Sequence, residues 1–291
     1  MSESTVNHMH EIFKRLCMIA CCLLLSSCGT KLSYNYADWI ISWYVDDYVD
    51  WNNAQQKQYD KTLDKFLSWH RNSELMRYRD WLVELKAVAL AEPDQQTLMN
   101  TLEPMQAFGS DALIYIFDDT ARLLSSLSDE QVKEMLGAMN DQQEAFEDDY
   151  RDEDTNKWKK RQIKTVKKFS KRFIGKLNKD QDAIVEAWIE KQKNLNNDWL
   201  DNRKNWTANF AQVLTLRNKP EQEALFKERL YLLFVEPQKL HKPDYTQAIN
   251  HNINNSSELM VGILASLNDK QREKLTKQFD KYIRILEDLA K

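Results

Sequence analysis

The chain has 291 residues and a net charge of −4, which disfavours nucleic acid as a partner. Glycine and proline number only five each, fewer than the turns of an all-β or α/β protein of this length require. Charged residues make up 30 % of the chain, and this turn-poor, polar composition predicts an all-α fold.

The first segment is typical of a targeting sequence. Residues 16–25 form an apolar stretch that follows Lys14 and Arg15 and is too short to span a bilayer. The stretch leads into Leu25-Ser26-Ser27-Cys28, which resembles the lipobox of bacterial lipoproteins. In that family a dedicated peptidase cuts before the cysteine, and the thiol then carries diacylglycerol.

The resemblance implies a cleaved signal peptide over residues 1–27, with translation starting at Met1 or Met9. It also implies attachment to a membrane by acylated Cys28, with the protein facing the periplasm of a Gram-negative bacterium. The next residue is Gly29 rather than the Asp that typically retains lipoproteins in the inner membrane, so the outer membrane is favoured.

Cysteine usage agrees with this location. After removal of the signal peptide, Cys28 is the one cysteine left, so we expect no disulfide and no thiolate metal site. The mature chain also has only three histidines, far apart in sequence and outside any metal-binding spacing. We therefore expect no metal and no cofactor.

After a lipidated N-terminus and short tether over residues 28–33, the sequence predicts a single helical periplasmic domain over residues 34–291. Apolar residues at helical spacing, interrupted by prolines, predict a bundle of roughly ten helices. The expected helices cover residues 34–48, 53–70, 74–90, 95–102, 111–126, 129–150, 158–174, 180–216, 221–235, 246–264 and 271–289.

Two of these helices are rich in aromatic residues. The helix nearest the anchor carries Trp39 and Trp43, which we expect to pack into the domain rather than to rest at the membrane interface. The helix over about 180–216 is predicted to be long and continuous, because its large apolar residues step by three, four or seven. That seam consists of Trp188, Leu195, Trp199, Trp206, Phe210 and Val213.

Residues 141–176 show a sharp charge change, from an acidic helix end to a basic helix start. This order opposes the helix dipole at both termini, and attraction across the hairpin could offset that cost. The simpler interpretation is two solvated faces in partial contact. The alternative is that the basic face, with Lys164, Lys167, Lys168 and Lys171, touches anionic lipid or an acidic partner.

A short pattern of Leu, then Ser or Asn, then Gln three residues later occurs three times, with a looser fourth copy at Trp51-Asn52-Asn53-Ala54-Gln55. Ser or Asn caps the first backbone N–H groups, and Gln reaches back to the cap residue. The pattern therefore predicts four helix starts. The cap and glutamine pairs of the three strict copies are Ser128 and Gln131, Asn178 and Gln181, and Asn268 and Gln271.

The repeated pattern also resembles the Leu-Thr-x-x-Gln motifs of small all-helical periplasmic chaperones, which cradle unfolded polypeptide. The likeness covers five-residue pieces only, and Ser or Asn stands where that family has Thr. Capping alone is sufficient to explain the pattern. The resemblance implies a polypeptide-binding role.

A broader resemblance is to a family of uncharacterised bacterial lipoproteins defined only as a domain of unknown function. Its residues here are Tyr34-x-Tyr36-x-Asp38-Trp39, Asp46-Asp47-Tyr48, Trp69-His70-Arg71 and Glu74-Leu75-x-x-Tyr78. Met76 departs from the pattern, in which proline often follows that leucine. The resemblance implies an envelope location and a helical fold, without an activity.

The best polar constellation in the chain combines Trp69, His70, Arg71 and Glu74, with Asp46, Asp47 and Asp50 able to approach if the first two helices pair. A histidine between carboxylates can act as a general base, but more often forms a structural hydrogen-bonded turn. No nucleophile elbow, P-loop or dinucleotide turn is present in the sequence. We expect a structural role and no catalytic residues.

These observations leave three functions open. The first is a non-enzymatic, lipid-anchored protein that binds polypeptide, in a chaperone-like or envelope-assembly role. The second is an envelope scaffold acting through the charged hairpin over residues 141–176, and the third is a cell-wall or glycan hydrolase centred on His70 and Glu74. The sequence does not identify a ligand, a partner or an oligomeric state.

Overall fold

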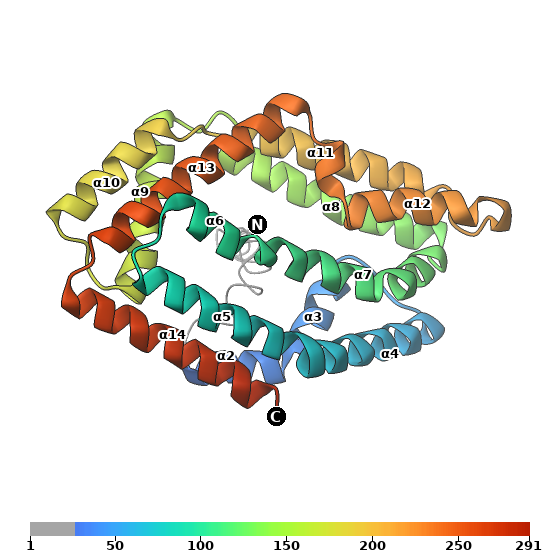
Figure 1. Ribbon diagram of the computed structural model, residues 1–291. Helices are drawn as coiled ribbons and strands as arrows, with labels where there is room; N and C mark the ends of the chain where they lie inside the picture. Colours follow the sequence, from blue (N-terminus) through green and yellow to red (C-terminus); the bar gives the residue numbers. More distant parts are fainter. Residues whose placement is uncertain (1–26) are drawn as a thin grey trace, which may run out of the picture. The chain divides into compact units, whose positions relative to one another are not determined.

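The computed structural model describes residues 27–291, which fold into helices and connecting turns without a strand, so the all-α prediction is confirmed (Figure 1). The expected signal peptide lies outside the described residues except for Ser27, and the side chain of Cys28 is also not described. Within the described part, no helix is both long and apolar enough to cross a bilayer.

Most helix bounds lie within three residues of the expected ranges. The exceptions are the expected helix over 34–48, which is divided in two at Tyr36, the expected helix over 111–126, which begins at Pro104, and the long helix treated below. The first helix begins before residue 34 and covers the expected tether. The elements are α2 (Ser27–Asn35), α3 (Ala37–Asp46), α4 (Asn53–Trp69), η1 (His70–Glu74), α5 (Leu75–Leu90), α6 (Gln95–Leu102), α7 (Pro104–Ser125), α8 (Asp129–Tyr150), α9 (Thr155–Phe173), α10 (Lys179–Lys191), α11 (Asn196–Leu214), η2 (Pro220–Gln222), α12 (Glu223–Phe234), η3 (Pro237–Leu240), α13 (Pro243–Ala265) and α14 (Asp269–Leu289).

The described chain divides into two compact units. Each unit is assembled from three separate stretches of chain. The first contains the residues up to Ser73, Gly109–Arg151 and Asn197–His241. The second contains Glu74–Phe108, Asp152–Asn196 and Lys242–Lys291. Neither unit is therefore a continuous segment, and no single cut in the sequence separates them.

The first unit is held by an apolar core that α7, α8, α11 and α12 share. Leu127, Leu214 and Leu230 are fully buried in this core, together with Phe210 and Phe226. Burying one such side chain contributes on the order of 2 kcal/mol relative to leaving it in water. The core forms because each helix carries apolar residues three or four positions apart along one face.

Two of the expected helix starts meet in this unit. Asn52 caps α4 and Ser128 caps α8, and each forms a complete capping box with its glutamine, Gln55 or Gln131. The two glutamines also bind one another: Gln55 Nε2 lies 3.1 Å from Gln131 Oε1, and Gln131 Nε2 lies 2.8 Å from Gln55 Oε1. We call this paired arrangement a glutamine clasp.

The remaining donors of the clasp bind the backbone. Gln55 Nε2 donates to the Ser126 carbonyl at 2.8 Å, and Gln131 Nε2 donates to the Asp50 carbonyl at 2.6 Å. Each glutamine thus ties its own helix start to the turn that precedes the other helix. A buried amide with all its hydrogen bonds made is stabilising, whereas a half-satisfied one is costly.

The second unit has its own core, centred on α5, α6, α10, α13 and α14. Helices α5 and α14 run side by side, as do α10 and α13 (Figure 1). Leu98, Val185 and Leu177 are buried in this core with Leu259, Leu267 and Leu275. Gly262 lets α13 approach α10 closely, because a Cβ at that position would lie 3.3 Å from Ile184 Cγ2.

A second glutamine clasp repeats the first. Asn178 caps α10 and Asn268 caps α14, again with complete capping boxes to Gln181 and Gln271. The two amides exchange hydrogen bonds of 2.9 Å in both directions. Gln181 Nε2 also donates to the Ser266 carbonyl at 3.1 Å, and Gln271 Nε2 donates to the Lys176 carbonyl at 3.2 Å.

The two clasps share the same amide and backbone hydrogen bonds, and the first has one more, from Gln55 Nε2 to Ser126 Oγ at 3.2 Å. In each, a serine two residues before the second cap donates its hydroxyl one turn back, from Ser126 to the Leu123 carbonyl and from Ser266 to the Ile263 carbonyl. The short sequence pattern thus builds the same hairpin closure in both units. The same local arrangement therefore occurs once in each unit, built from copies of one five-residue pattern.

The expected long helix over 180–216 is wrong: it breaks into α10 and α11. Gln192 has an extended conformation, with φ −73° and ψ 139°. Side chains of α13 take up the backbone groups that the break leaves open. Asn252 Oδ1 accepts from the Lys193 N–H at 2.9 Å, and Asn252 Nδ2 donates to the Lys193 carbonyl at 2.9 Å.

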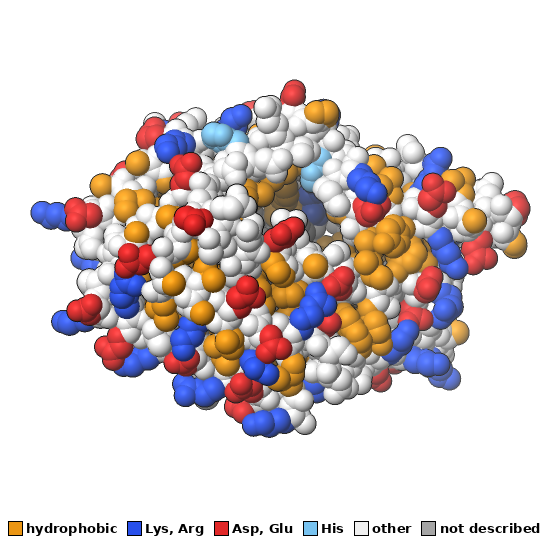
Figure 2. Space-filling model, viewed as in Figure 1, with side chains coloured by type: hydrophobic (Ala, Val, Ile, Leu, Met, Phe, Trp, Pro, Cys, Tyr) orange, Lys and Arg blue, Asp and Glu red, His pale blue; other side chains and the backbone are white. Residues whose placement is uncertain are grey.

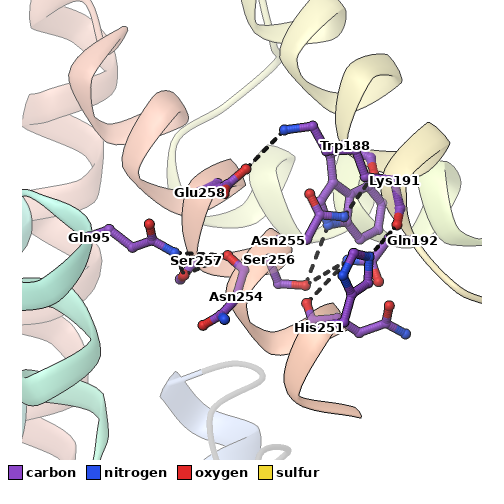
Figure 3. A network of polar contacts seen from close by, with 11 residues as sticks. Gln95, Trp188, Lys191, Gln192, His251, Asn254, Asn255, Ser256, Ser257 and Glu258 are labelled. Carbon is purple, nitrogen blue, oxygen red and sulfur yellow. Dashed lines mark hydrogen bonds and ion pairs between the residues drawn. The ribbon is translucent and has the colours of Figure 1, made fainter. Parts of the chain in front are cut away.

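Further contacts hold the same break. Gln192 Nε2 donates to Ser256 Oγ at 3.0 Å, and His251 Nε2 lies 2.8 Å from the Lys191 carbonyl (Figure 3). The apolar spacing gave no sign of the break, because the partner residues lie about 60 positions away. The expected single seam is also wrong, since Trp188 packs against the core of the second unit while Trp206 packs against that of the first.

Candidate functional site

His70 lies where α4 passes into the π-helical turn η1. Its Nδ1 is hydrogen-bonded to the Tyr34 hydroxyl at 2.9 Å, and the rings of Phe66 and Trp69 flank it. Burial lowers the pKa of His70 from 6.5 to about 4, so the imidazole is neutral at ordinary pH. Burial likewise raises the pKa of Tyr34 to about 12, with Arg71 opposing the shift.

The neighbouring residues of the expected site are held by aromatic contacts. The Trp69 ring stacks on Tyr115 of α7, with ring centroids 4.1 Å apart and planes 10° apart. The Arg71 guanidinium lies over the Tyr34 ring at 5.0 Å. Such stacked and cation–π pairs each contribute on the order of 1 kcal/mol, and they anchor α2 and α7 to the end of α4.

Glu74 is buried at the other end of η1, and its ion-pair partner is Arg77. Arg77 Nη1 lies 3.0 Å from Glu74 Oε2. Asp46 and Asp47 are exposed at the C-terminal end of α3, and Asp50 is exposed in the turn after it. The acidic residues expected to converge on His70 are thus placed in water or paired with an arginine.

The contacts around His70 are those of a hydrogen-bonded aromatic turn. A base whose pKa is about 4 is mostly unprotonated but weak at neutral pH, and burial restricts its access to substrate. The sequence does not reveal Tyr34 as the partner of His70, because the two lie 36 residues apart. Among residues 27–291, no cluster of His, Cys, Asp and Glu has the geometry of a metal site.

The basic half of the charged hairpin forms α9 in the second unit. Asp154 caps α9 by accepting a hydrogen bond from the Lys157 N–H at 2.9 Å, so the helix starts with a negative charge that suits its dipole. The expected conflict with the dipole is therefore relieved at this end. Three cations of α9 have acidic partners, in the pairs Lys159 with Glu190, Arg161 with Glu153, and Lys167 with Asp182.

Four other lysines of α9, at positions 160, 164, 168 and 171, form what we call the lysine row. They step by four, four and three, so they share one face of the helix, and all four are exposed. Within residues 27–291, none of them has a carboxylate within 4.0 Å. A shallow, open depression runs along this face, lined by the four lysines, Lys167, Ile163 and Glu186.

The lysine row differs from the set suggested by the sequence. Lys167 belongs to that set but is paired with Asp182 at 3.0 Å, whereas Lys160 has no carboxylate partner and lies outside that set. Helical spacing from Lys164 could have identified Lys160, because the two are four residues apart. The ion pair of Lys167 could not be foreseen, because Asp182 lies on α10.

The structure also corrects the expected placement of the aromatic residues nearest the anchor. Trp39 and Trp43 were expected to pack into the domain, but they are 65 % and 44 % exposed. Tyr36 and Leu32 are exposed as well, at 56 % and 59 %. The expectation fails because the opposite side of α2 and α3 already provides the packing face, through Tyr34 of α2 and Ile41 and Val45 of α3.

Elsewhere on the surface, charged and hydrophobic side chains are intermixed. On the face drawn in Figure 2, acidic and basic side chains are interspersed, and hydrophobic side chains show between them around α7. Leu113 and Ile114 of α7 are among the exposed hydrophobic residues, at 36 % and 48 %. Scattered exposed hydrophobic residues are normal on protein surfaces and by themselves identify no site.

Comparison with known proteins adds a family and no activity. A family model described as "Family of unknown function (DUF6279)" matches residues 47–246, about two thirds of the chain. The matched range contains the whole first clasp and, in the second clasp, the Lys176 carbonyl, Asn178 and Gln181, but not the residues of α13 and α14. No curated protein and no solved structure matches the chain.

Proposed function

Because the chain belongs to the family of unknown function DUF6279, we propose its role from its own surface. It is a non-enzymatic, lipid-anchored protein of the periplasm that binds an acidic polypeptide of the cell envelope. The observation that carries the proposal is the lysine row of α9. The anchor and its location rest on the lipobox that ends at Cys28, and the outer membrane is the proposed site of attachment.

The four lysines of the row repel one another, and no carboxylate of the described residues lies close enough to compensate their charge. Like charges at i and i+4 repel one another and destabilise a helix by a few tenths of a kcal/mol per pair. The neighbouring cations Lys159, Arg161 and Lys167 avoid this through acidic partners within the second unit. An anionic partner would relieve the repulsion within the row, and such an attraction weakens as salt increases.

The length of the row suits an extended chain better than a small anion. From Lys160 to Lys171 the helix rises by about 16 Å, the span of roughly five residues of extended polypeptide. The depression is shallow, with Ile163 and the lysine stems as apolar walls. Several carboxylates of one polypeptide can therefore be met at once.

The test is partner capture by crosslinking in intact cells, followed by mass spectrometry. The test variant replaces Lys160, Lys164, Lys168 and Lys171 by Glu. The control variant makes the same change at four exposed lysines outside α9: Lys57, Lys61, Lys133 and Lys219. Both variants have the same net charge, and circular dichroism confirms that both are folded. We expect the test variant to lose its partners and the control to keep them.

The outcomes separate the competing interpretations. Many unrelated acidic polypeptides captured through the row indicate a chaperone-like role, and one or two reproducible partners indicate a scaffold. Equal capture by both variants would overturn the proposal. Vesicles with and without phosphatidylglycerol form a second arm. If the row is needed only for binding anionic vesicles, it contacts lipid and the proposed polypeptide role is wrong.

A further inference from the structure

A row of large apolar side chains faces outward on the helices next to the anchor. Leu32, Tyr36, Trp39 and Trp43 step by four, three and four, so they share one face of a helix. Helices α2 and α3 are nearly continuous here, because the Tyr36 N–H donates to the Leu32 carbonyl and the Ile40 N–H donates to the Tyr36 carbonyl. We call these four residues the aromatic stripe.

The stripe is held outward by packing on the other side of the helix. Tyr34 is 5 % exposed and hydrogen-bonded to His70, and Ile41 and Val45 pack against the buried cluster of Tyr59, Leu63 and Leu123. Tyr59 Oη also donates to Ser42 Oγ at 3.3 Å. The stripe therefore cannot turn inward without breaking this face.

We propose that the aromatic stripe lies in the interface of the lipid bilayer that holds acylated Cys28. The proposal goes beyond polypeptide binding and does not depend on it, although it shares the lipobox. Leu32 is four residues after Cys28, which is about 6 Å along a helix. Tryptophan and tyrosine are the residues that favour the headgroup level, where their rings are apolar and their polar atoms remain wet.

The two ends of the stripe indicate how the helix lies relative to the membrane. From Leu32 to Trp43 the helix rises by about 16 Å, more than the roughly 6–8 Å thickness of one interfacial layer, so it must lie closer to the membrane plane than to its normal. Asp46 and Asp47 follow Trp43 by three and four residues and are exposed, so they continue the stripe with charges that stay in water. The Leu32 end of the stripe, next to acylated Cys28, therefore lies deeper in the membrane than the Trp43 end.

This contact would orient the first unit on the membrane. An acyl anchor alone leaves a protein free to rotate about its tether, whereas a second contact along a rigid helix holds one face of the unit toward the lipid. The stripe itself carries no charge, so its contact with lipid should be insensitive to salt. That property distinguishes it from the lysine row.

The experiment uses the mature acylated protein in phosphatidylcholine vesicles with brominated acyl chains, which quench nearby tryptophan. The chain has nine tryptophans, and the comparison is with the double variant Trp39→Phe and Trp43→Phe. We expect quenching in the original protein and loss of most of it in the variant. Equal quenching in both would show that the two residues are not in lipid and would overturn the proposal.

A second measurement removes the acyl chains by Cys28→Ser and follows vesicle binding directly. Trp39→Ser with Trp43→Ser should weaken partition to zwitterionic vesicles by roughly tenfold or more. The matched control, Leu113→Ser with Ile114→Ser on α7, should leave it unchanged. A dimer in sedimentation that the tryptophan substitutions dissociate would overturn the proposal in favour of a second copy of the chain as occupant.

Discussion

Gln181 and Gln271 bind each other through both amide groups, and each nitrogen lies 2.9 Å from the other's oxygen. Each amide also closes the capping box of its own helix and reaches the backbone of the turn before the other helix. Four polar groups that would be costly to bury alone are thus mutually satisfied. The clasp explains how a motif found at separate helix starts determines which helices are neighbours.

Breaking the second clasp should destabilise the protein. Gln181 is fully buried, so Gln181→Leu removes one half of a capping box and leaves Gln271 without its partner. We expect a loss of about 2–4 kcal/mol in the free energy of unfolding, measured by urea denaturation. Gln131→Leu in the first clasp should cost less, because Gln131 is only half-buried and water can replace its partners.

The coupling within this pair can be measured separately. The double variant Gln181→Leu with Gln271→Leu should cost clearly less than the sum of the single variants, because it leaves no orphaned amide. Additive losses would show that the amides act independently, as ordinary caps, and that the clasp contributes nothing of its own.

His70 should make stability fall as the pH is lowered. Its pKa is about 4 in the folded protein and 6.5 in the unfolded chain, so the unfolded chain binds the proton first. This contribution is complete above pH 6.5 and is lost progressively between pH 6.5 and 4. From pH 7.5 to 5 we expect a loss of about 2 kcal/mol through this residue.

The variant His70→Gln isolates that effect, because glutamine stays neutral and can still bind the Tyr34 hydroxyl. Denaturation of both proteins at pH 7.5 and pH 5 should show the variant gaining about 2 kcal/mol relative to the original protein. A pH-independent difference would mean that His70 is as easily protonated in the folded protein as in the unfolded chain.

Asn252 should control opening of the break between α10 and α11. Its side chain makes two hydrogen bonds of 2.9 Å to the Lys193 backbone, so Asn252→Ala should raise hydrogen exchange at the Lys193 amide by roughly tenfold. Asn250→Ala, at an exposed position of the same helix, is the control and should leave the exchange unchanged. Similar exchange in both variants would indicate that other contacts hold the break.

Two glycines should respond oppositely to substitution by alanine. Gly175 ends α9 with φ 99°, a conformation that disfavours a side chain, so Gly175→Ala should cost about 1 kcal/mol. Gly137 lies inside α8, where an added Cβ meets nothing within 4 Å, so Gly137→Ala should gain up to about 1 kcal/mol. Thermal or urea denaturation of the pair tests both signs, and a shift of the same sign in both would contradict this reasoning.

The sequence alone determined the features that depend on neighbours a few residues away. Helical composition, scarce glycine and proline, and the Ser/Asn-x-x-Gln pattern are local signals, and they located the helix starts at Asn52, Ser128, Asn178 and Asn268. A capping box is satisfied within one turn, so its physics is already complete in the sequence.

Only the tertiary structure decided which of these local elements meet and which faces they leave open. Asn252 stabilises a break about 60 residues away, and Tyr34 rather than a carboxylate reaches His70. Asp182 removes Lys167 from the lysine row, and the packing of Ile41 and Val45 turns Trp39 outward. Each of these outcomes depends on contacts between segments that are distant in sequence. The spacing of residues within one helix cannot predict such contacts.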